Sequence, residues 1–499
     1  MSAAGPSPAY CGIDVGTQGV RAVIVAADGA LLGSGKAELS GGHRDGVRHE
    51  QSPDSWWHAV RHAVRDAVSA AGPDVAVAAV ALDATSGTVV VEDADGVPRG
   101  PGLMYDDTRA ADQAARAQRV GADLWSALGY RIQPAWALPK VLWLQEQDAL
   151  RAGDRVVHQS DHLLRRLTGY PIPTDTSHAL KTGVDLRIAD WPEQTFAELG
   201  IGRALLPDVV LPGTVVGEVS ATGAAETGLP QGAVIRAGMT DSCAAQIAAR
   251  ALRPGSWSSA LGTTLAIKGS TPQLLHDPTG AVYCHRSPDG GWLPGGASST
   301  GAGILRDTFP DADSDALTAL TGPAAALVPV AQVVYPLAGS GERFPFVAPQ
   351  ARGFGLAELD SDAARFAALC QGIAYVERLA YDVLGVLGAD VSGPVSLTGG
   401  PTRNDWWNQL RADVLGRPVL LPESGQAAVG MAVLAAARPG ELAQTAEAMV
   451  ALREVREPDP DRSAQLLPGY HRLVRALADR DWLPRQTAEA VLTRTGTSG

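Results

Sequence analysis

Residues 10–21, YCGIDVGTQGVR, decide the fold that this sequence predicts. A short apolar run ends in an acid, Asp14, and a turn rich in glycine leads into a second apolar run, residues 22–26. A further turn at residues 28–29 precedes more apolar residues, so the pattern predicts a β-hairpin with a third strand behind it. Backbone amides in such a glycine turn form an anion-binding concavity, and Asp14 beside it is suited to holding a metal ion.

The same design returns in the second half of the chain. Residues 256–267, SWSSALGTTLAI, again place a Gly-Thr turn between two strands, and residues 238–242, GMTDS, precede them. One hairpin with a Gly-Thr turn is also an ordinary structural feature. Two of them, about half a chain apart, predict two related lobes that bind one nucleotide.

These stretches resemble the FGGY carbohydrate kinases, which belong to the actin-like ATPase superfamily. Residues 14–19 are similar to the first phosphate motif of that family and residues 261–264 to the second, while Asp241 stands where the family keeps its catalytic base. The resemblance extends from about Tyr10 to Leu477. It implies an α/β fold of two actin-like (ribonuclease H-like) ATPase domains with an active-site cleft between them.

Composition limits the partners. Acidic residues outnumber Lys and Arg by 54 to 41, and the net charge of −13 argues against nucleic acid or an anionic membrane as the main partner. It does not argue against a small phosphate-bearing ligand, because amides and Mg²⁺ bind one on an acidic protein. The four cysteines have neither zinc spacing nor a disulfide framework, which fits a cytoplasmic location. We find no signal-peptide pattern and no apolar run of membrane-spanning length.

We expect a domain boundary at residues 253–255, Arg-Pro-Gly. By the resemblance, residues 1–252 form an N-terminal domain with the sugar site, the first phosphate motif and the catalytic aspartate. Residues 253–485 form a C-terminal domain that binds ATP. The polar residues 486–499 are expected to be a flexible tail.

The sugar site is predicted at the end of a buried strand. The apolar residues 75–82 lead into the polar run DATSGT, residues 83–88, and strand ends of this kind are common ligand positions in α/β sheets. A hydrogen-bonded turn is the other interpretation. In relatives this position contacts the sugar, so the resemblance implies that Thr85 and Ser86 bind substrate.

Residues 103–109, LMYDDTR, resemble the motif that lines the sugar pocket of the family. Asp107 and Arg109 match the motif and are expected to bind substrate. Asp106 stands where the motif usually has Asn, and a carboxylate accepts hydrogen bonds but does not donate them as an amide does. This difference leaves the fine specificity open.

Two further segments depart from the family pattern. Residues 174–185 resemble the ribulose-specific branch, which tends to have Asn where Ser177 and His178 stand. His178 has no partner histidine at metal spacing, and we do not assign it a catalytic role. Gln426 replaces a usual Glu ahead of the closing helix and is likewise given no catalytic role.

The nucleotide site is predicted from glycine turns in the second half. The resemblance places Gly303, at the start of a helix, beside the nucleotide. Residues 394–404 are expected to form a strand, a glycine turn and a helix start, and residues 404–419 resemble the adenosine motif of the family. Gly399 and Gly400 would approach the adenine and the α-phosphate, and Asn404 would help to hold the base.

Asp241 is the predicted catalytic residue. It follows a short apolar strand, residues 234–237, and opens a helix, so its carboxylate has a fixed orientation near a positive helix end. A simple helix N-cap is the competing interpretation. The position of Asp241 ahead of the second Gly-Thr turn favours catalysis.

The chain has neither a Walker-type phosphate loop nor a protein-kinase His-Arg-Asp motif, so phosphoryl transfer needs another set of groups. Asp14 and Asp241 are expected near the Mg²⁺ ion, and Asp241 would accept the proton of a primary sugar hydroxyl. The residues expected to hold the β- and γ-phosphates of ATP are Gly16, Thr17, Gln18, Gly262, Thr263 and Thr264.

Within the family, four segments look most like the D-ribulokinase or xylulokinase-like branch: residues 83–87, 104–109, 179–183 and 341–345. This resemblance implies ATP-dependent conversion of D-ribulose to D-ribulose 5-phosphate. D-Xylulose, which differs at one stereocentre, is the closest alternative. A sugar- and nucleotide-binding regulator without transfer activity, or an actin-like ATPase of another kind, also stays open. The latter proteins lack a sugar-lining motif such as that at Asp107 and Arg109. The sequence does not reveal an oligomeric state, and a homodimer is compatible with it.

Overall fold

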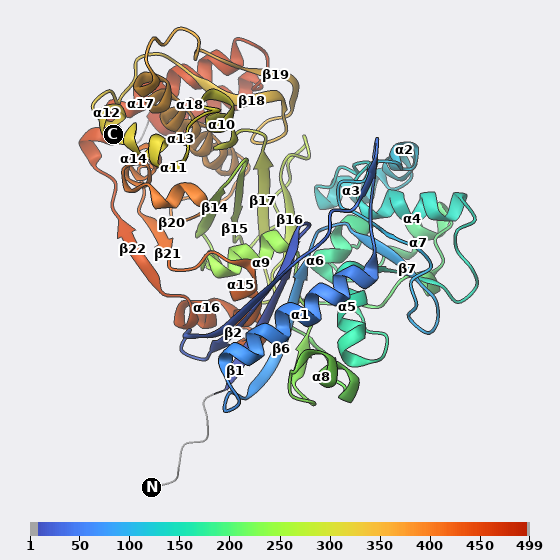
Figure 1. Ribbon diagram of the computed structural model, residues 1–499. Helices are drawn as coiled ribbons and strands as arrows, with labels where there is room; N and C mark the ends of the chain where they lie inside the picture. The colour runs from blue at the N-terminus through green and yellow to red at the C-terminus, as the bar shows by residue number, and fades with distance from the viewer. Residues whose placement is uncertain (1–7, 497–499) are drawn as a thin grey trace. The chain divides into compact units, whose positions relative to one another are not determined.

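The predicted hairpin lies in the middle of a six-stranded sheet with the order β12-β13-β6-β1-β2-β3 (Figure 1). The structure is a computed structural model that describes residues 8–496. β1 pairs antiparallel with β2 and parallel with β6, as a hairpin joined to a crossover requires. The strands of this sheet are β1 (Ala9–Val15), β2 (Gly19–Ala26), β3 (Leu31–Glu38), β6 (Val77–Ala84), β12 (Val215–Glu218) and β13 (Val234–Arg236).

Helices pack directly on both faces of this sheet because glycines make room for them. A Cβ on Gly12 would lie 1.8 Å from the carbonyl oxygen of Ala428 in α15, and a Cβ on Gly35 would lie 2.1 Å from that of Ala63 in α1. The two glycines pair with consecutive residues of β2, so they face opposite sides of the sheet. α15 (Ala427–Ala436) and α1 (Pro53–Ala71) therefore cover opposite faces. Ser52 is the N-cap residue of α1 and Pro53 its first residue, although the Ser52 side chain makes no capping hydrogen bond.

A second, five-stranded sheet with the order β4-β5-β8-β7-β9 accompanies the first. Its strands are β4 (His43–Asp45), β5 (Arg48–Gln51), β7 (Val89–Glu92), β8 (Gly102–Leu103) and β9 (Arg155–His158). A short parallel pair is formed by β10 (Thr174–Asp175) and β11 (Val209–Val210). The helices in this part of the chain are α2 (Ala111–Val120), α3 (Ala122–Leu128), α4 (Ala137–Glu146), α5 (Gln159–Thr168), α6 (Thr176–Ala179), α7 (Glu193–Leu199), α8 (Ala221–Thr227) and α9 (Asp241–Ala248).

The second half of the chain repeats the pairing of the first hairpin. β14 pairs antiparallel with β15 and parallel with β20, as β1 does with β2 and β6. The sheet has the order β16-β17-β15-β14-β20-β21-β22. This common pairing is the structural form of the repeat that the two Gly-Thr turns predict. The strands are β14 (Trp257–Leu261), β15 (Leu265–Gly269), β16 (Tyr283–Arg286), β17 (Trp292–Ser298), β20 (Val395–Thr398), β21 (Val419–Pro422) and β22 (Leu452–Arg456).

A separate antiparallel pair and seven helices accompany this sheet among the described residues. The pair consists of β18 (Tyr335–Glu342) and β19 (Ala348–Phe354). The helices are α10 (Gly303–Thr308), α11 (Ser314–Ala319), α12 (Thr321–Ala325), α13 (Asp362–Val386), α14 (Asp405–Leu415), α17 (Pro460–Ala478) and α18 (Arg485–Gly496).

The described chain divides into two compact units that are not continuous in sequence. Unit 1 contains residues up to 250 together with residues 285–292 and 424–451. Unit 2 contains residues 251–284, 293–423 and those from 452 onward. Residues 424–451, which carry α15 and α16 (Leu442–Met449), therefore pack in unit 1, whereas the division predicted from the sequence assigns them to the second domain.

The prediction of a flexible tail is wrong for residues 486–496. They belong to α18, in which Ala488, Val491 and Thr495 are buried. Although the segment is mostly polar, one side of the helix is buried in unit 2. Residues 497–499 lie outside the described part of the chain. All four cysteines are buried and unpaired. No helix in residues 8–496 is long and apolar enough to cross a membrane.

Candidate active site

Three aspartates gather at one edge of the unit 1 sheet. Asp14 on β1 and Asp83 on β6 are direct partners in the parallel pairing. β6 continues through Ala84, which forms a parallel bridge with Thr240, the residue before Asp241. Because the carboxyl ends of parallel strands meet at the same edge of a sheet, the three carboxylates lie at one ligand position.

The charges at this edge act on one another. Burial raises the pKa of Asp14, and the nearby charge of Asp241 raises it further, although Nη1 of Arg21 lies 3.7 Å from the Asp14 carboxylate. Asp83 is fully buried, and no donor group of the described residues reaches its oxygens, so its hydrogen bond is the one that its protonated form makes with Asp14. Burial, followed by the charges of Asp14 and Asp241, raises the pKa of Asp83 well above its usual range.

Asp83 is a site residue that the sequence analysis did not single out. The signal for it was present, since an acid directly after an apolar strand needs a partner or a ligand. The same run of residues predicts Thr85 and Ser86 as substrate contacts instead, because relatives contact the sugar at this position.

A divalent cation fits this edge as a partly hydrated ion. Among residues 8–496, no group of three or more His, Cys, Asp or Glu side chains is arranged to hold a metal by itself. Mg²⁺ in phosphoryl-transfer sites commonly takes one or two carboxylates together with water and phosphate oxygens. Asp14 and Asp241, whose charges repel each other, provide a donor set of that size.

The backbone ahead of Asp241 is held firmly. Thr240 is the N-cap residue of α9, and its backbone N–H donates to Oγ of Ser177 at 3.2 Å. A Cβ on Gly238 would lie 1.8 Å from the carbonyl oxygen of Leu82. Asp241 itself is the first residue of α9 and is partly exposed, and its Oδ1 accepts from the N–H of Ser242 at 2.7 Å.

Ser177 and His178, which depart from the family pattern, contact the backbone next to the aspartates. Ser177 bonds to Thr240, and His178 lies against Ala84. Oδ2 of Asp175 accepts from Nδ1 of His178 at 2.6 Å, and Nε2 of His178 lies 3.3 Å from the carbonyl oxygen of Ala84. Burial opposes the charge on His178, but the carboxylate of Asp175 outweighs it and raises the pKa of the imidazole. Both residues therefore support the ends of strands that carry the acids.

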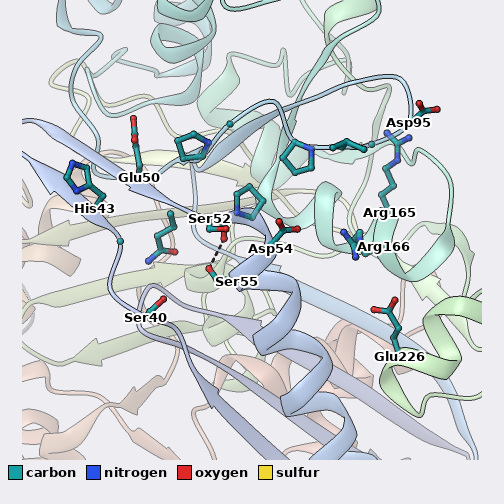
Figure 2. Close-up of a pocket in the computed structure, with 18 of the residues that line it drawn as sticks. Ser40, His43, Glu50, Ser52, Asp54, Ser55, Asp95, Arg165, Arg166 and Glu226 are labelled. Atoms are coloured by element: carbon teal, nitrogen blue, oxygen red, sulfur yellow. Dashed lines mark hydrogen bonds between the residues drawn. The ribbon is translucent and has the colours of Figure 1, made fainter.

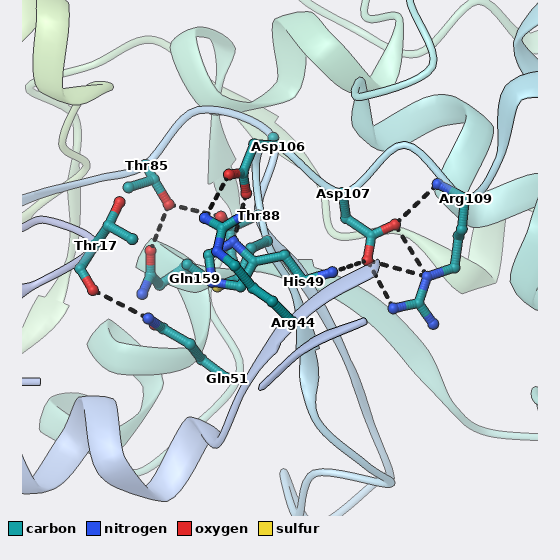
Figure 3. Close-up of polar contacts among 12 residues, drawn as sticks. Thr17, Arg44, His49, Gln51, Thr85, Thr88, Asp106, Asp107, Arg109 and Gln159 are labelled. Atoms are coloured by element: carbon teal, nitrogen blue, oxygen red, sulfur yellow. Dashed lines mark hydrogen bonds and ion pairs between the residues drawn. The ribbon is translucent and has the colours of Figure 1, made fainter. Parts of the chain in front are cut away.

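The predicted first phosphate turn connects β1 to β2. The N–H of Gly16 donates to the carbonyl oxygen of Gly19 at 3.0 Å, and the N–H of Leu39 donates to that of Gln18 at 3.0 Å. The carbonyl oxygen of Thr17 accepts from Nε2 of the buried Gln51 at 3.0 Å (Figure 3). These hydrogen bonds hold the backbone of the turn in one conformation.

The predicted sugar residues Thr85 and Ser86 differ in their surroundings. Oγ1 of Thr85 is hydrogen-bonded to Thr88 and to Gln159, at 2.6 and 2.9 Å (Figure 3). Oγ of Ser86 is buried and has no partner among the described residues. Ser86 therefore has hydrogen-bonding capacity to offer a ligand, whereas Thr85 first has to give up an internal bond.

Asp107 and Arg109 are paired with each other. The guanidinium donates to both carboxylate oxygens of Asp107, with a shortest distance of 2.6 Å (Figure 3). It also donates to Glu50 at 2.6 Å. Although burial opposes it, the hydrogen bonds from Arg109 and from the N–H of His49 lower the pKa of Asp107. A sugar bound here would have to use the hydrogen-bonding positions of Asp107 and Arg109 that their ion pair leaves unused. The sugar contact of these two residues stays a prediction.

The acid at position 106, where the family usually has Asn, accepts hydrogen bonds from two donors within the protein. Its two oxygens accept from Nη2 of Arg44 at 2.7 Å and from Nδ1 of His49 at 2.5 Å (Figure 3). The Asn that is usual in the family offers one acceptor oxygen, whereas a carboxylate serves both donors.

Lys140 on α4 joins two loops of the predicted sugar site. It is fully buried, and its Nζ donates to the carbonyl oxygens of Gly87 and Met104 at 2.9 and 2.5 Å. Burial lowers the pKa of Lys140 to about 7. A lysine in a helix gave no sequence signal for this role.

A cavity of about 810 Å³ lies beside the start of α1 (Figure 2). Its described lining includes Glu50, Gln51, Asp54, Arg165 and Glu226, but none of the residues predicted to bind sugar or phosphate. This cavity is distinct from the edge with the three aspartates. It touches the site only through the bonds of Glu50 and Gln51 described above.

In unit 2, three predicted glycine segments meet around the second Gly-Thr turn. A Cβ on Gly301 would lie 2.4 Å from the carbonyl oxygen of Thr263, and one on Gly303 would lie 2.8 Å from Cγ2 of Thr263. A Cβ on Gly399 would lie 2.1 Å from the carbonyl oxygen of Leu261. The segments expected to surround a nucleotide are therefore in backbone contact with one another.

The predicted adenosine segment borders a cavity of about 360 Å³ in unit 2. Gly400, Asn404, Phe366 and Trp406 line it, and the two aromatic rings stack with their centroids 6.3 Å apart. The Asn404 side chain is already engaged, because its oxygen caps the N–H of Trp407 and its Nδ2 donates to Thr321 at 2.9 Å. Gln426 is an N-cap residue without a side-chain capping bond.

Comparison with known proteins gives one consistent result. Residues 9–248 match the N-terminal domain of the FGGY family of carbohydrate kinases, and residues 256–438 match its C-terminal domain. The xylulose kinase of Streptomyces coelicolor is 32% identical over 87% of this chain and 89% of that protein. The xylulose kinase of Streptomyces rubiginosus is 31% identical over 87% of this chain and 89% of its own length.

A solved structure has the same fold. The crystal structure of xylulose kinase from Rhodospirillum rubrum matches with a TM-score of 0.84 and 24% identity, over 94% of this chain and 98% of that one. The paired hairpins and the two α/β units are thus those of FGGY kinase structures and are consistent with actin-like ATPase domains.

Proposed function

This chain belongs to the FGGY family of carbohydrate kinases and is a sugar kinase, and we propose that it phosphorylates the terminal hydroxyl of a pentulose with ATP. The observation that supports the proposal most is the gathering of Asp14, Asp83 and Asp241 at one sheet edge. Phosphoryl transfer needs a cation site and a base at one position, and this edge offers both.

The proposed chemistry assigns one task to each group. The N–H groups of residues 17, 18, 263 and 264 bind phosphate oxygens, because those of Gly16 and Gly262 already donate to carbonyl oxygens within their own turns. Asp14 and Asp241 are the side chains that would hold Mg²⁺, which neutralises phosphate charge when bound. The carboxylate of Asp241 accepts the proton of the sugar hydroxyl. The hydroxyl oxygen then forms a bond to the γ-phosphorus, the bond to the β-phosphate oxygen breaks, and ADP leaves. General-base help of this kind is worth about a hundred- to ten-thousand-fold in rate.

We propose D-xylulose as the substrate, because the relatives at 31–32% identity are xylulose kinases. D-Ribulose is the second candidate, since residues 83–88 and 103–109 resemble the ribulose branch. The two sugars differ at one stereocentre, so the choice depends on individual hydrogen bonds. Ser86, with its free hydroxyl capacity, is the residue that we propose contacts the sugar.

The proposal is tested by ADP release in a coupled assay with ATP and Mg²⁺, using D-xylulose, D-ribulose and no sugar as the three conditions. We expect sugar-dependent turnover, with a higher kcat/KM for D-xylulose. A higher value for D-ribulose would transfer the assignment to that sugar. Sugar binding without turnover would indicate a regulator, and sugar-independent hydrolysis would indicate an ATPase of another kind.

A further inference from the structure

Glu342, the last residue of β18, is a buried carboxylate that accepts five hydrogen bonds from uncharged donors. Two of its donors are backbone N–H groups on Oε1, and three are hydroxyls on Oε2. The donors are Ser299 N (2.6 Å), Arg343 N (3.0 Å), Ser298 Oγ (3.0 Å), Thr300 Oγ1 (3.0 Å) and Tyr335 OH (2.7 Å). Burial, and then the charge of Glu342, raises the pKa of Tyr335, so this hydroxyl remains a donor.

Three of the donors are consecutive, so the carboxylate fixes the loop between β17 and α10. The hydroxyl of Ser298 donates to Glu342 and accepts from the N–H of Thr300 at 2.9 Å. Ser298 and Thr300 are fully buried. The geometry of residues 298–300 is therefore set by one side chain that is distant in sequence.

This loop in turn holds the second Gly-Thr turn through backbone hydrogen bonds. The N–H of Leu265 donates to the carbonyl oxygen of Thr300 at 2.8 Å. On the other side of the turn, the N–H of Ala302 donates to Gly262 at 2.9 Å and that of Gly303 donates to Thr263 at 3.1 Å. The loop thus contacts the turn on both sides.

The backbone of the loop at Gly301 packs closely against the backbone of the Gly-Thr turn. A Cβ at Gly301 would lie 2.4 Å from both the carbonyl oxygen of Thr263 and Cα of Thr264. Loop and turn are packed backbone against backbone, so a displacement of the loop displaces the turn. Two hydrogen bonds lead from Glu342 through Thr300 to the N–H of Leu265, the residue directly after the turn of residues 262–264.

We propose that Glu342 is a positioning residue for nucleotide binding, and that it presets the turn of residues 262–264 through the loop of residues 298–303. The identity of the nucleotide as ATP rests on the proposed function, whereas the mechanical role does not. Glu342 does not touch the nucleotide in this role.

The cost of Glu342 argues that it does more than fill the core. A buried carboxylate without a cation is costly, and its negative charge disfavours a phosphate bound nearby. An apolar residue of similar size would avoid both costs but would leave five donors without their acceptor. What the carboxylate provides is two oxygens that hold those donors in one arrangement.

The test compares Glu342→Ala and Glu342→Gln with Asp413→Asn. Asp413 is a fully buried acid of the same unit, and the described partners of its carboxylate are Gln409, the N–H of Asp459 and Arg462, all remote in sequence from the turn. Three properties are measured: hydrogen exchange in the ligand-free protein, the ADP dissociation constant by calorimetry, and the melting temperature. The amides that report on the turn are those of Leu265, Ala302 and Gly303.

In Glu342→Ala we expect faster exchange at these three amides and an ADP dissociation constant raised by about tenfold or more, because buried donors lose their acceptor. Glu342→Gln, which keeps one acceptor oxygen, should show a smaller change. Asp413→Asn should lower the melting temperature without either effect. Unchanged exchange at the reporter amides, or equal loss of ADP affinity in Asp413→Asn, would overturn the inference.

These outcomes are separable from the proposed function. If wild-type protein shows no sugar-dependent turnover, the kinase proposal fails, but exchange at the three amides still reports on the role of Glu342. If Glu342→Ala does not fold, Glu342→Gln and Ser298→Ala give the same readout, since each removes part of the same set of bonds.

Discussion

Asp14 and Asp83 are direct partners on the parallel strands β1 and β6, with both carboxylates at the same edge of the sheet. Asp83 is fully buried, and its pKa is raised by burial, by the charges of Asp14 and Asp241, and by the hydrogen bond that its protonated form makes with Asp14. This clustering of acidic groups is unfavourable in the protein without a bound ligand. A bound cation would relieve it, because it would offset the charges that neighbour Asp83.

Replacement of Asp83 by Asn should stabilise the ligand-free protein at alkaline pH. The native state keeps a proton on Asp83 that the unfolded chain releases near its usual pKa of about 3.9. For this group, stability is therefore greatest below that value and decreases as the pH rises towards the folded pKa. We expect Asp83→Asn to raise the free energy of unfolding by about 1 kcal/mol or more at pH ~8, with little gain at pH ~4.

Urea titrations of both proteins at the two pH values measure this difference. An equal difference at both values would show that the charge of Asp83 is not the cause. A loss of stability at pH ~8 would mean that the carboxylate has a favourable partner in solution.

Asp83 also shows which parts of the site the sequence predicts and which it does not. The turn at residues 16–18 and the acid before it are predictable, because a glycine turn between two apolar runs is a local signal. The partnership of Asp83 with Asp14 is not local, since it depends on the register of parallel strands almost seventy residues apart in sequence.

The same distinction holds for the fold. Both Gly-Thr hairpins and the strand before Asp241 were predicted correctly from residues that are neighbours in sequence. The return of α15 to unit 1 was missed, because its contact with Gly12 joins residues more than four hundred positions apart. The roles of Lys140 and Glu342 were missed for the same reason, since their partners are carbonyls and hydroxyls of distant segments.

Replacement of Asp241 by Asn should abolish most turnover while leaving nucleotide binding in place. The variant cannot accept a proton, and loss of a general base costs about a hundred- to ten-thousand-fold in kcat. The backbone here is held by Thr240 and Ser177, so the fold should persist. We therefore expect kcat to be largely lost, while the ADP dissociation constant stays within about threefold of the wild-type value.

Calorimetry with ADP and the coupled assay provide the two readouts for Asp241→Asn. The neighbouring Ser242→Ala is the matched control, because Ser242 is also partly exposed at the start of α9. Parallel loss of turnover and ADP affinity would assign Asp241 to nucleotide binding or to the fold rather than to proton transfer.

Replacement of Lys140 by Met should destabilise unit 1 in a pH-dependent way. Met fills the volume but leaves the carbonyl oxygens of Gly87 and Met104 without a donor, at a cost of about 1–3 kcal/mol. The folded pKa of about 7 lies below the unfolded value of about 10.4. Between these values the unfolded chain binds the extra proton, so the lysine protein gains stability as the pH rises from about 7, and the Met variant does not.

The difference in free energy of unfolding between the two proteins should therefore widen from pH ~7 to pH ~9. Thermal unfolding at both pH values checks it. A gap that narrows with rising pH would mean that Lys140 stays charged in the folded protein and contributes as a cation.

Replacement of Gly399 by Ala should weaken nucleotide binding in unit 2. Gly399 has φ +96° and ψ 174°, a conformation that residues with a side chain rarely adopt, and its Cβ would meet the carbonyl oxygen of Leu261 at 2.1 Å. The strain falls on the junction between β20 and the turn of residues 262–264. We expect the ADP dissociation constant to rise by about tenfold, as 1–3 kcal/mol of local strain requires.

Gly388→Ala separates backbone strain from the steric clash. Gly388 has nearly the same φ, +97°, but a Cβ there has open space around it. Both variants should lower the melting temperature, because both place alanine at a positive φ. The selective loss of ADP affinity should appear only in Gly399→Ala, since only there does the added atom press on Leu261, the residue before the phosphate-binding turn. If the two variants bind ADP equally well, Gly399 is required for the stability of unit 2 and not for the shape of the nucleotide site.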